Sequence, residues 1–228
     1  MSGDRRPLKS RNTAWAAGLS AWLVRRGVRP NTISLASVGF SAIAGLALLA
    51  TFWSCATACT IALYLSAAAG IQLRLLCNLM DGMVAVEGGM GGPLGNIYND
   101  LPDRFADVFI LLGAGFAVRA WRLGVLDGAT LGWLAALAAV LTAYVRVLGA
   151  QAGAQQHFLG PMAKPHRMAV MTLACLLAAA ERLIGWPPRA LAAALALVVL
   201  GCALTMVRRL LRIAADLRAL KTPSPPNG

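Results

Sequence analysis

The chain has 228 residues, of which 58% are hydrophobic and only 13% are charged. Soluble domains usually carry about a quarter charged residues, and the mean hydropathy of this chain is +0.66. This composition excludes a disordered or collagen-like chain and an ordinary soluble globule, and it indicates a bilayer as the solvent. The 21 Lys and Arg against 9 Asp and Glu give a net charge of +12. Because the basic residues cluster between apolar stretches, we interpret this excess as a cytoplasmic membrane face and not as a nucleic-acid-binding surface.

The first thirty residues differ from the rest of the chain. Trp15, Leu19, Trp22 and Leu23 are spaced to share one helix face, and Arg and Lys residues flank them. A basic amphipathic helix that carries Trp lies in the membrane interface. Residues 1–30 therefore predict a cytoplasmic juxtamembrane helix, with a cleaved signal peptide as the alternative.

Residues 31–221 carry the apolar segments, and a spanning helix needs about 20 mostly apolar residues. The fold class predicted is an all-α integral membrane protein with six transmembrane helices after the amphipathic interfacial helix. The six predicted spans cover residues 33–52, 56–86, 95–118, 129–149, 168–183 and 189–207, and an extension of the last helix to Leu220 is left open. The proline-rich tail, 222–228, is predicted to be disordered.

The orientation follows from the Lys and Arg residues in short loops. They concentrate in the amino-terminal segment, between the fourth and fifth spans, and in the carboxy-terminal segment. The positive-inside rule places both termini, the 87–95 loop and the 150–166 loop in the cytoplasm.

Acidic residues are rare, yet five of the nine fall between positions 81 and 107. Spacings of three and four put polar residues on one face of each of two successive helices, and the loop between them folds the helix ends together. The residues of this acidic cluster are Asn78, Asp81, Glu87, Asn99, Asp100, Asp103 and Asp107.

Converging carboxylate and amide oxygens suit a hard divalent cation, Mg²⁺ or Mn²⁺. Two alternatives remain open at this point. The residues could cap two helix ends and pair with Arg74 and Arg104, or they could line a cation or proton path in a transporter.

The same window resembles the signature of the CDP-alcohol phosphotransferases (CDP-alcohol phosphatidyltransferases), D-x2-D-G-x2-A-R-x8-G-x3-D-x3-D. The register is gapless. Identities fall at Asp81, Gly82, Ala85, Gly95 and Asp103, whereas Asn78 and Asn99 replace two Asp residues and Val86 replaces the Arg. In the family, the first span begins with the pattern Pro-Asn-x-Thr/Ser, and residues 30–34 are similar to it. Residues 160–167 are similar to a later basic stretch of the family.

The resemblance implies an enzyme that transfers a phosphatidyl (substituted phosphate) group from a CDP-alcohol, most simply CDP-diacylglycerol, to a small polar alcohol or alcohol phosphate. CMP is released, Mg²⁺ or Mn²⁺ is required, and the pathway is phospholipid biosynthesis. It also implies a homodimer that contacts membrane lipid. A bacterial inner membrane is the expected location, and no nucleic acid is expected as a partner.

The resemblance also implies roles for individual residues. Asp103 is the expected base, and the expected metal ligands are Asn78, Asp81, Asn99 and Asp103, with Asp107 in reserve. The CDP-binding positions are Asn31, Asp81, Gly82, Ala85 and Gly95. A pocket for a phosphate on the acceptor is expected at Arg146, Lys164 and Arg167, although cytoplasmic Lys and Arg also serve topology alone.

The two Asn residues leave two other functions open. One is a catalytically impaired relative that binds nucleotide-lipid, and the other is a cation- or proton-coupled transporter.

Overall fold

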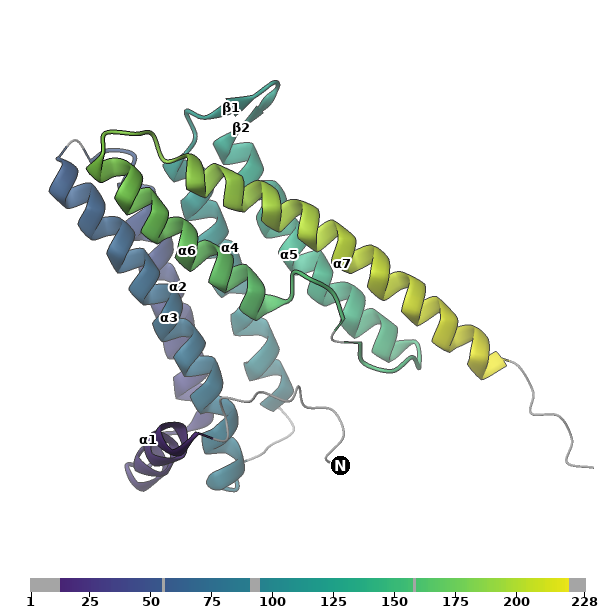
Figure 1. The fold of residues 1–228 in the computed structure, drawn as a ribbon. Coiled ribbons are helices and arrows are strands. Elements are labelled where there is room, and N and C mark those ends of the chain that lie inside the picture. The colour runs from purple at the N-terminus through teal and green to yellow at the C-terminus, as the bar shows by residue number, and fades with distance from the viewer. Residues whose placement is uncertain (1–12, 55, 91–94, 158, 222–228) are drawn as a thin grey trace, which may run out of the picture.

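The structure is a computed structural model that describes residues 13–54, 56–90, 95–157 and 159–221, without the side chains at 96, 99, 123 and 221. Residues 1–12 of the expected juxtamembrane segment and the expected disordered tail lie outside this part. The described elements, in chain order, are α1 (Ala14–Arg25), α2 (Pro30–Ala50), α3 (Thr57–Glu87), α4 (Gly95–Ala117), β1 (Arg122–Leu123), β2 (Leu126–Asp127), α5 (Gly128–Gln151), α6 (Lys164–Leu183) and α7 (Arg189–Lys221) (Figure 1).

The six long helices form a closed ring of pairwise contacts. Going round it, α2 packs on α3, α3 on α6, α6 on α7, α7 on α5, α5 on α4, and α4 returns to α2. The interior is rich in small residues. In a bilayer the hydrophobic effect does not drive helices together, and small side chains let the backbones approach closely enough for van der Waals packing to do so. Fully buried alanines of this core include Ala44, Ala67, Ala114, Ala135 and Ala139.

Glycines fix the position of α4 against its two neighbours. A Cβ on Gly45 of α2 would lie 2.3 Å from the carbonyl oxygen of Phe109, and one on Gly113 of α4 would lie 2.3 Å from the carbonyl oxygen of Gly45. On the other side, a Cβ on Gly115 would lie 2.6 Å from the Cα of Gly132 in α5. The backbones of α2, α4 and α5 therefore touch directly, so α4 has little freedom to slide.

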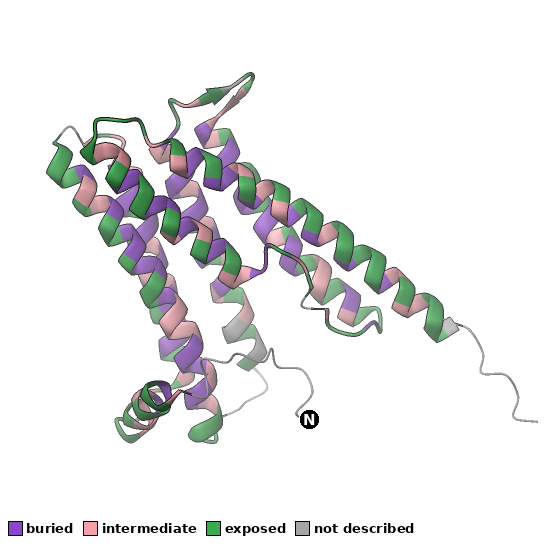
Figure 2. Ribbon diagram, viewed as in Figure 1, coloured by how far each residue is buried: buried purple, intermediate pink, exposed green. Residues whose placement is uncertain are grey.

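The outer surface of the ring is apolar. Leu46, Leu137 and Leu200 are more than half exposed, and along each long helix exposed residues alternate with buried ones that face the interior (Figure 2).

Four helices of the described part, α2, α3, α5 and α7, are long and apolar enough to cross a membrane. The chain is thus an integral membrane protein of all-α class, as predicted. Helices α4 and α6 occupy the third and fifth predicted spans, but they do not meet the same requirement for length and apolar character. The count of six spans therefore stays a prediction.

Two local features differ from the sequence-based expectation or extend it. The segment between the third and fourth predicted spans contains a hairpin, β1–β2, whose turn places Gly124 at φ +59°. Its strands have two residues each, too few to show an alternating pattern. Helix α7 runs on to Lys221, so the extension left open by the sequence is present.

The amphipathic helix α1 lies across the end of the bundle (Figure 1) and packs on α3. Its buried positions are Ala16 and Ser20, and Leu19 and Leu23 pack against a small core that includes Met80 and Val84. Trp15 and Trp22 are exposed. The helix thus divides its apolar residues between the protein and the exterior, which suits an interfacial helix.

The close approach of α2 and α4 generates a stability prediction. We expect Gly45→Ala to lower the free energy of unfolding by about 1–3 kcal/mol, the usual cost of overpacking, because its Cβ must displace backbone. Thermal unfolding in detergent measures the effect. The control is Gly39→Ala on the same helix, where a Cβ meets nothing within 4 Å. Equal melting temperatures for the two variants would contradict the packing described for α2 and α4.

Candidate active site

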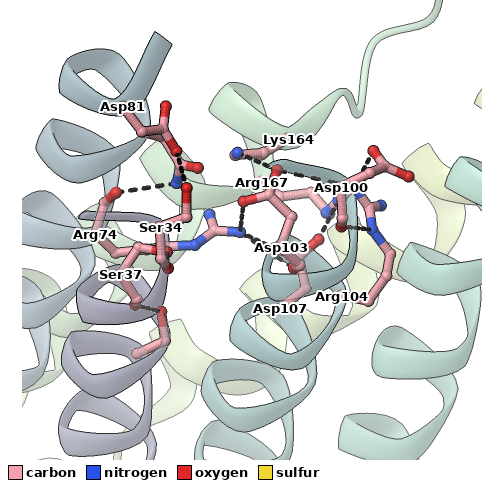
Figure 3. A network of polar contacts seen from close by, with 12 residues as sticks. Ser34, Ser37, Arg74, Asp81, Asp100, Asp103, Arg104, Asp107, Lys164 and Arg167 are labelled. Atoms are coloured by element: carbon pink, nitrogen blue, oxygen red, sulfur yellow. Dashed lines mark hydrogen bonds and ion pairs between the residues drawn. The ribbon is translucent and has the colours of Figure 1, made fainter. Parts of the chain in front are cut away.

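One end of the ring gathers charged side chains from three helices. Asp81 comes from α3, Asp103 and Asp107 come from α4, and Lys164 and Arg167 come from the first turn of α6 (Figure 3). The three carboxylates are only 4%, 6% and 0% exposed, respectively. Buried carboxylates are costly unless they are paired or bind a cation, so the partners of each one decide what it does.

Asp107 is held by two arginines. Its Oδ1 accepts a hydrogen bond from Nη2 of Arg74 at 2.7 Å, and its Oδ2 accepts one from Nη2 of Arg167 at 2.5 Å. Nη1 of Arg167 also donates to the carbonyl oxygen of Met162 at 2.9 Å. Both oxygens of Asp107 are therefore engaged in ion pairs between buried groups. This engagement fits a role in holding α3, α4 and α6 together better than the reserve metal ligand expected from the sequence.

Asp103 keeps one oxygen free of hydrogen bonds. Its Oδ2 pairs with Nζ of Lys164, whereas its buried Oδ1 accepts no hydrogen bond and lies 3.7 Å from Nη2 of Arg74. Asp81 has the same asymmetry. Its Oδ2 accepts a hydrogen bond from Oγ of Ser34 at 2.8 Å, and its Oδ1 is buried without a partner. Two family-motif carboxylates thus each present one unsatisfied oxygen.

The Asn and Gly positions of the motif frame these carboxylates. Asn78 donates from Nδ2 to the carbonyl oxygen of Arg74 at 3.0 Å, one turn back on α3. Asn99 lies on α4, but its side chain falls outside the described residues. A Cβ on Gly95 would meet no atom of the described residues within 4 Å, and Gly82 and Ala85 are partly exposed. Within the described part of the chain, space therefore remains open beside Gly95.

A second set of ion pairs lies at the rim of the site. Asp100 accepts hydrogen bonds from Nη2 of Arg146 at 2.7 Å and from Nη2 of Arg104 at 3.3 Å, and its side chain is 39% exposed. The pairing of the cluster with Arg74 and Arg104, which the sequence left open as an alternative, is thus present. Glu87 and Asn31 are exposed and make no hydrogen bond or ion pair with the other described residues of the site.

The structure joins two sets of residues that the sequence treated separately. The basic residues expected to bind an acceptor phosphate all pair with the acidic cluster, Arg146 with Asp100, Lys164 with Asp103 and Arg167 with Asp107.

One contact was missed by sequence reasoning, the hydrogen bond from Ser34 to Asp81. The available signal was the position of Ser34 one helical turn after Asn31, within the family-like stretch 30–34.

The donor set fits a hard divalent cation only through a small number of ligands. Within the described residues, no three His, Cys, Asp or Glu side chains gather closely enough to hold a metal ion. The buried oxygens that accept no hydrogen bond are Oδ1 of Asp81 and Oδ1 of Asp103, of which the second lies 3.7 Å from Nη2 of Arg74. Carboxylate and amide oxygens are the ligands that Mg²⁺ and Mn²⁺ take. The oxygen atoms of Asp81 and Asp103, with Asn78 nearby, are therefore of the type that such a cation binds.

Comparison with known proteins adds the fold. No family model and no curated protein matches this chain. The structure is similar to that of phosphatidylinositol phosphate synthase of Mycobacterium tuberculosis with CDP-DAG bound, at a TM-score of 0.73 and 17% identity, over 93% of this chain and 100% of that chain. This chain shares the fold of the CDP-alcohol phosphotransferases.

Two further structures of that enzyme agree. The form in complex with manganese and citrate matches at a TM-score of 0.70 and 17% identity, over 93% of this chain and 96% of that chain. The apo form matches at a TM-score of 0.67 and 17% identity, over 90% of this chain and 100% of that chain. The resemblance read from the motif is therefore confirmed for the fold.

The two kinds of ion pair predict different responses to mutation. We expect Asp107→Asn to destabilise the protein by about 3–5 kcal/mol, because breaking a buried ion pair leaves an uncompensated charge. Arg167 would lose its carboxylate, and Arg74 would keep only the more distant Asp103. Asp100→Asn is the matched control and should cost about 0–1 kcal/mol, because that carboxylate is partly exposed. Thermal unfolding in detergent compares them. An Asp107→Asn variant as stable as the control would show that the buried pairs do not hold the helices.

Proposed function

We propose that this protein transfers a phosphatidyl group from a CDP-alcohol, CDP-diacylglycerol in the simplest case, to a small polar alcohol with release of CMP. The observation that carries the proposal is the pair of buried carboxylates, Asp81 and Asp103, each with one oxygen that accepts no hydrogen bond. They lie at two motif positions on α3 and α4. Support also comes from the shared fold with a synthase whose structure contains CDP-DAG.

The reaction needs a nucleophile, a base and a leaving group. The hydroxyl oxygen of the acceptor forms a bond to the phosphorus that carries the diacylglycerol, and the bond from that phosphorus to the bridging oxygen breaks. The electron pair leaves with CMP, and the hydroxyl proton goes to a base. Asp103 is the proposed base because its Oδ1 is buried and accepts no hydrogen bond, so a lone pair is available.

A divalent cation, Mg²⁺ or Mn²⁺, is the proposed cofactor, and manganese is present in one structure of the similar synthase. The residues that would hold it are Asn78, Asp81, Asn99 and Asp103. When bound, such a cation stabilises negative charge on the diphosphate and on the leaving CMP. Asp107 is left out of the proposed ligand set because both of its oxygens are engaged by arginines.

The nucleotide is proposed to lie along the open side of α3 and α4. A Cβ on Gly95 would meet no described atom within 4 Å, and the small residues Gly82 and Ala85 would let the nucleotide approach the helix backbone. Asn31, at the start of α2, is exposed on the same chain segment that supplies Ser34. These positions form the proposed CDP-binding surface, which lipid tails would reach from the bilayer.

The acceptor is proposed to carry a phosphate or another anionic group. Arg146, Lys164 and Arg167 already bind carboxylates in this structure, so the same side chains can receive phosphate oxygens. Arg146 is the best placed for exchange, since its partner Asp100 is partly exposed. Lys164 would then contact both the anionic group of the acceptor and the carboxylate of Asp103.

The membrane setting is part of the proposal. We infer that the active site and both termini face the cytoplasm, that the location is a bacterial inner membrane and that the enzyme is a homodimer. The bias of Lys and Arg toward one side of the bundle supports the orientation.

A second candidate function is a relative that binds the CDP-lipid without transferring it. It is favoured by Asn at two of the four acidic motif positions and by the pairing of all three expected phosphate-binding cations with carboxylates. A transporter is supported less, because the buried carboxylates gather at one end of the bundle, whereas transport sites usually lie near the middle of the membrane.

The decisive assay is CMP release from CDP-diacylglycerol by the purified protein, with and without Mg²⁺ or Mn²⁺, across a panel of alcohols and alcohol phosphates. We expect metal-dependent release that requires one acceptor. Asp103→Asn should lower kcat by about 10²–10⁴, the usual contribution of a general base. Asp127→Asn is the control, because Asp127 caps α5 through Thr130 and lies outside the site. Binding of CDP-diacylglycerol without CMP release across the panel would favour the second candidate.

Arg146 provides a separate test of the acceptor site. We expect Arg146→Ala to raise the KM for a phosphorylated acceptor by about tenfold, because one charge-assisted hydrogen bond is worth about 1.5–3 kcal/mol, while the KM for CDP-diacylglycerol changes little. Steady-state kinetics in each substrate separates the two. An equal rise in both KM values would argue that Arg146 acts on the site as a whole.

A further inference from the structure

The side chains that hydrogen bonds and ion pairs join at this end of the bundle, which do not include the exposed Glu87, carry more positive than negative charge before any ligand binds. They include four carboxylates, Asp81, Asp100, Asp103 and Asp107, and five cationic side chains, Arg74, Arg104, Arg146, Lys164 and Arg167. The excess is one positive charge. A site built to hold a resident divalent cation needs the opposite balance, because each ligand carboxylate offsets part of the charge of the ion.

Three motif positions and one further residue set this balance. Asn78 and Asn99 stand where the family motif has carboxylates, which removes two negative charges, and Val86 stands where it has an arginine, which removes one positive charge. Arg74, one turn before Asn78 on α3, carries a positive charge that is fully buried, with Nη2 on Asp107. Its Nε and Nη1 are buried without a hydrogen-bond partner. A guanidinium in this setting is permanently charged and fixed in place.

A divalent cation entering this site alone meets an unfavourable field. Like charges repel more strongly in a buried site than in water, and Arg74 and Lys164 both flank Asp103. The diphosphate of a CDP-alcohol changes the balance, since each of its two phosphates brings one negative charge. A divalent cation and this diphosphate together add no net charge to the site.

We propose that this protein keeps no resident divalent cation and takes up Mg²⁺ or Mn²⁺ only together with the diphosphate of its CDP-alcohol substrate. The free oxygens of Asp81 and Asp103 supply the protein ligands, and the diphosphate supplies the negative charge that Asn78 and Asn99 do not. This inference rests on the proposed function for the identity of the diphosphate. The charge balance itself does not.

The test measures Mn²⁺ binding to the full chain in detergent by electron paramagnetic resonance, with and without saturating CDP-diacylglycerol. We expect wild-type protein to bind Mn²⁺ at least about tenfold more tightly when the nucleotide-lipid is present. Asn78→Asp restores one negative charge and should tighten Mn²⁺ binding about tenfold without any nucleotide, a difference of about 1.4 kcal/mol. The control, Gln156→Glu, adds the same charge to the exposed loop before α6 and should leave Mn²⁺ binding unchanged.

A second variant, Arg146→Gln, removes a positive charge from the partly exposed rim. It tests the same proposal if Asn78→Asp does not fold. It should also tighten Mn²⁺ binding in the absence of nucleotide. Equal Mn²⁺ affinity of the wild-type protein with and without CDP-diacylglycerol would overturn the proposal, and so would failure of both variants to tighten it. Absence of CDP-diacylglycerol binding in every arm would instead overturn the proposed function. Tighter Mn²⁺ binding by the variants would then still establish the charge balance.

Discussion

The ion pairs that Asp107 makes with Arg74 and Arg167 constrain the rest of the structure. They join α3, α4 and α6 at one depth, in a region where neither water nor lipid can replace a lost partner. Helices α3 and α4 both pack on α2 and have little direct contact with each other, and Arg74 joins them directly through its ion pairs with Asp103 and Asp107. Because these charges are buried, each depends on the others, and the group has one arrangement in which all are paired.

Backbone contacts at glycines also hold the helices in position. The backbones of Gly45 and Gly113 touch, which fixes α4 against α2. Ser34 on α2 donates to Asp81 on α3, and Asp103 on α4 faces Lys164 on α6. The two carboxylates with free oxygens are thus held from both sides by elements that the packing has already positioned. Such pre-organisation is what chemistry on a diphosphate requires, because catalysis there is mostly placement and charge.

The same network explains why loss of two acids need not mean loss of function. In this chain the cluster is balanced by its own arginines and lysine, so it can fold without a metal ion. The positive charge then becomes available to phosphate groups instead. A site of this kind is suited to binding an anionic substrate first and to completing its ligand set with oxygens of that substrate.

The sequence by itself determined the class of fold and the place of the candidate site. Apolar segments of spanning length predicted α2 to α6 and the start of α7 within a few residues, although α7 runs well beyond the predicted span. The gapless spacing from Asn78 to Asp103 placed the candidate site on α3 and α4. These features are local, since hydrophobic length and the spacing of three or four residues act within one helix. The hairpin at 122–127 escaped prediction because two-residue strands carry no periodic signal.

Only the tertiary structure decided which charges pair. The i, i+4 spacing of Asp103 and Asp107 puts both on one face of α4, which suggested Asp107 as a reserve ligand beside Asp103. In the fold, Asp107 points between Arg74 and Arg167 and is fully paired, whereas Asp103 keeps one oxygen free. Their partners lie as far as 61 residues away along the chain, on helices whose depth is set by packing. Helical spacing defines a face, but it cannot say which side chain of another helix meets that face, and that choice separates the structural carboxylate from the one proposed to do chemistry.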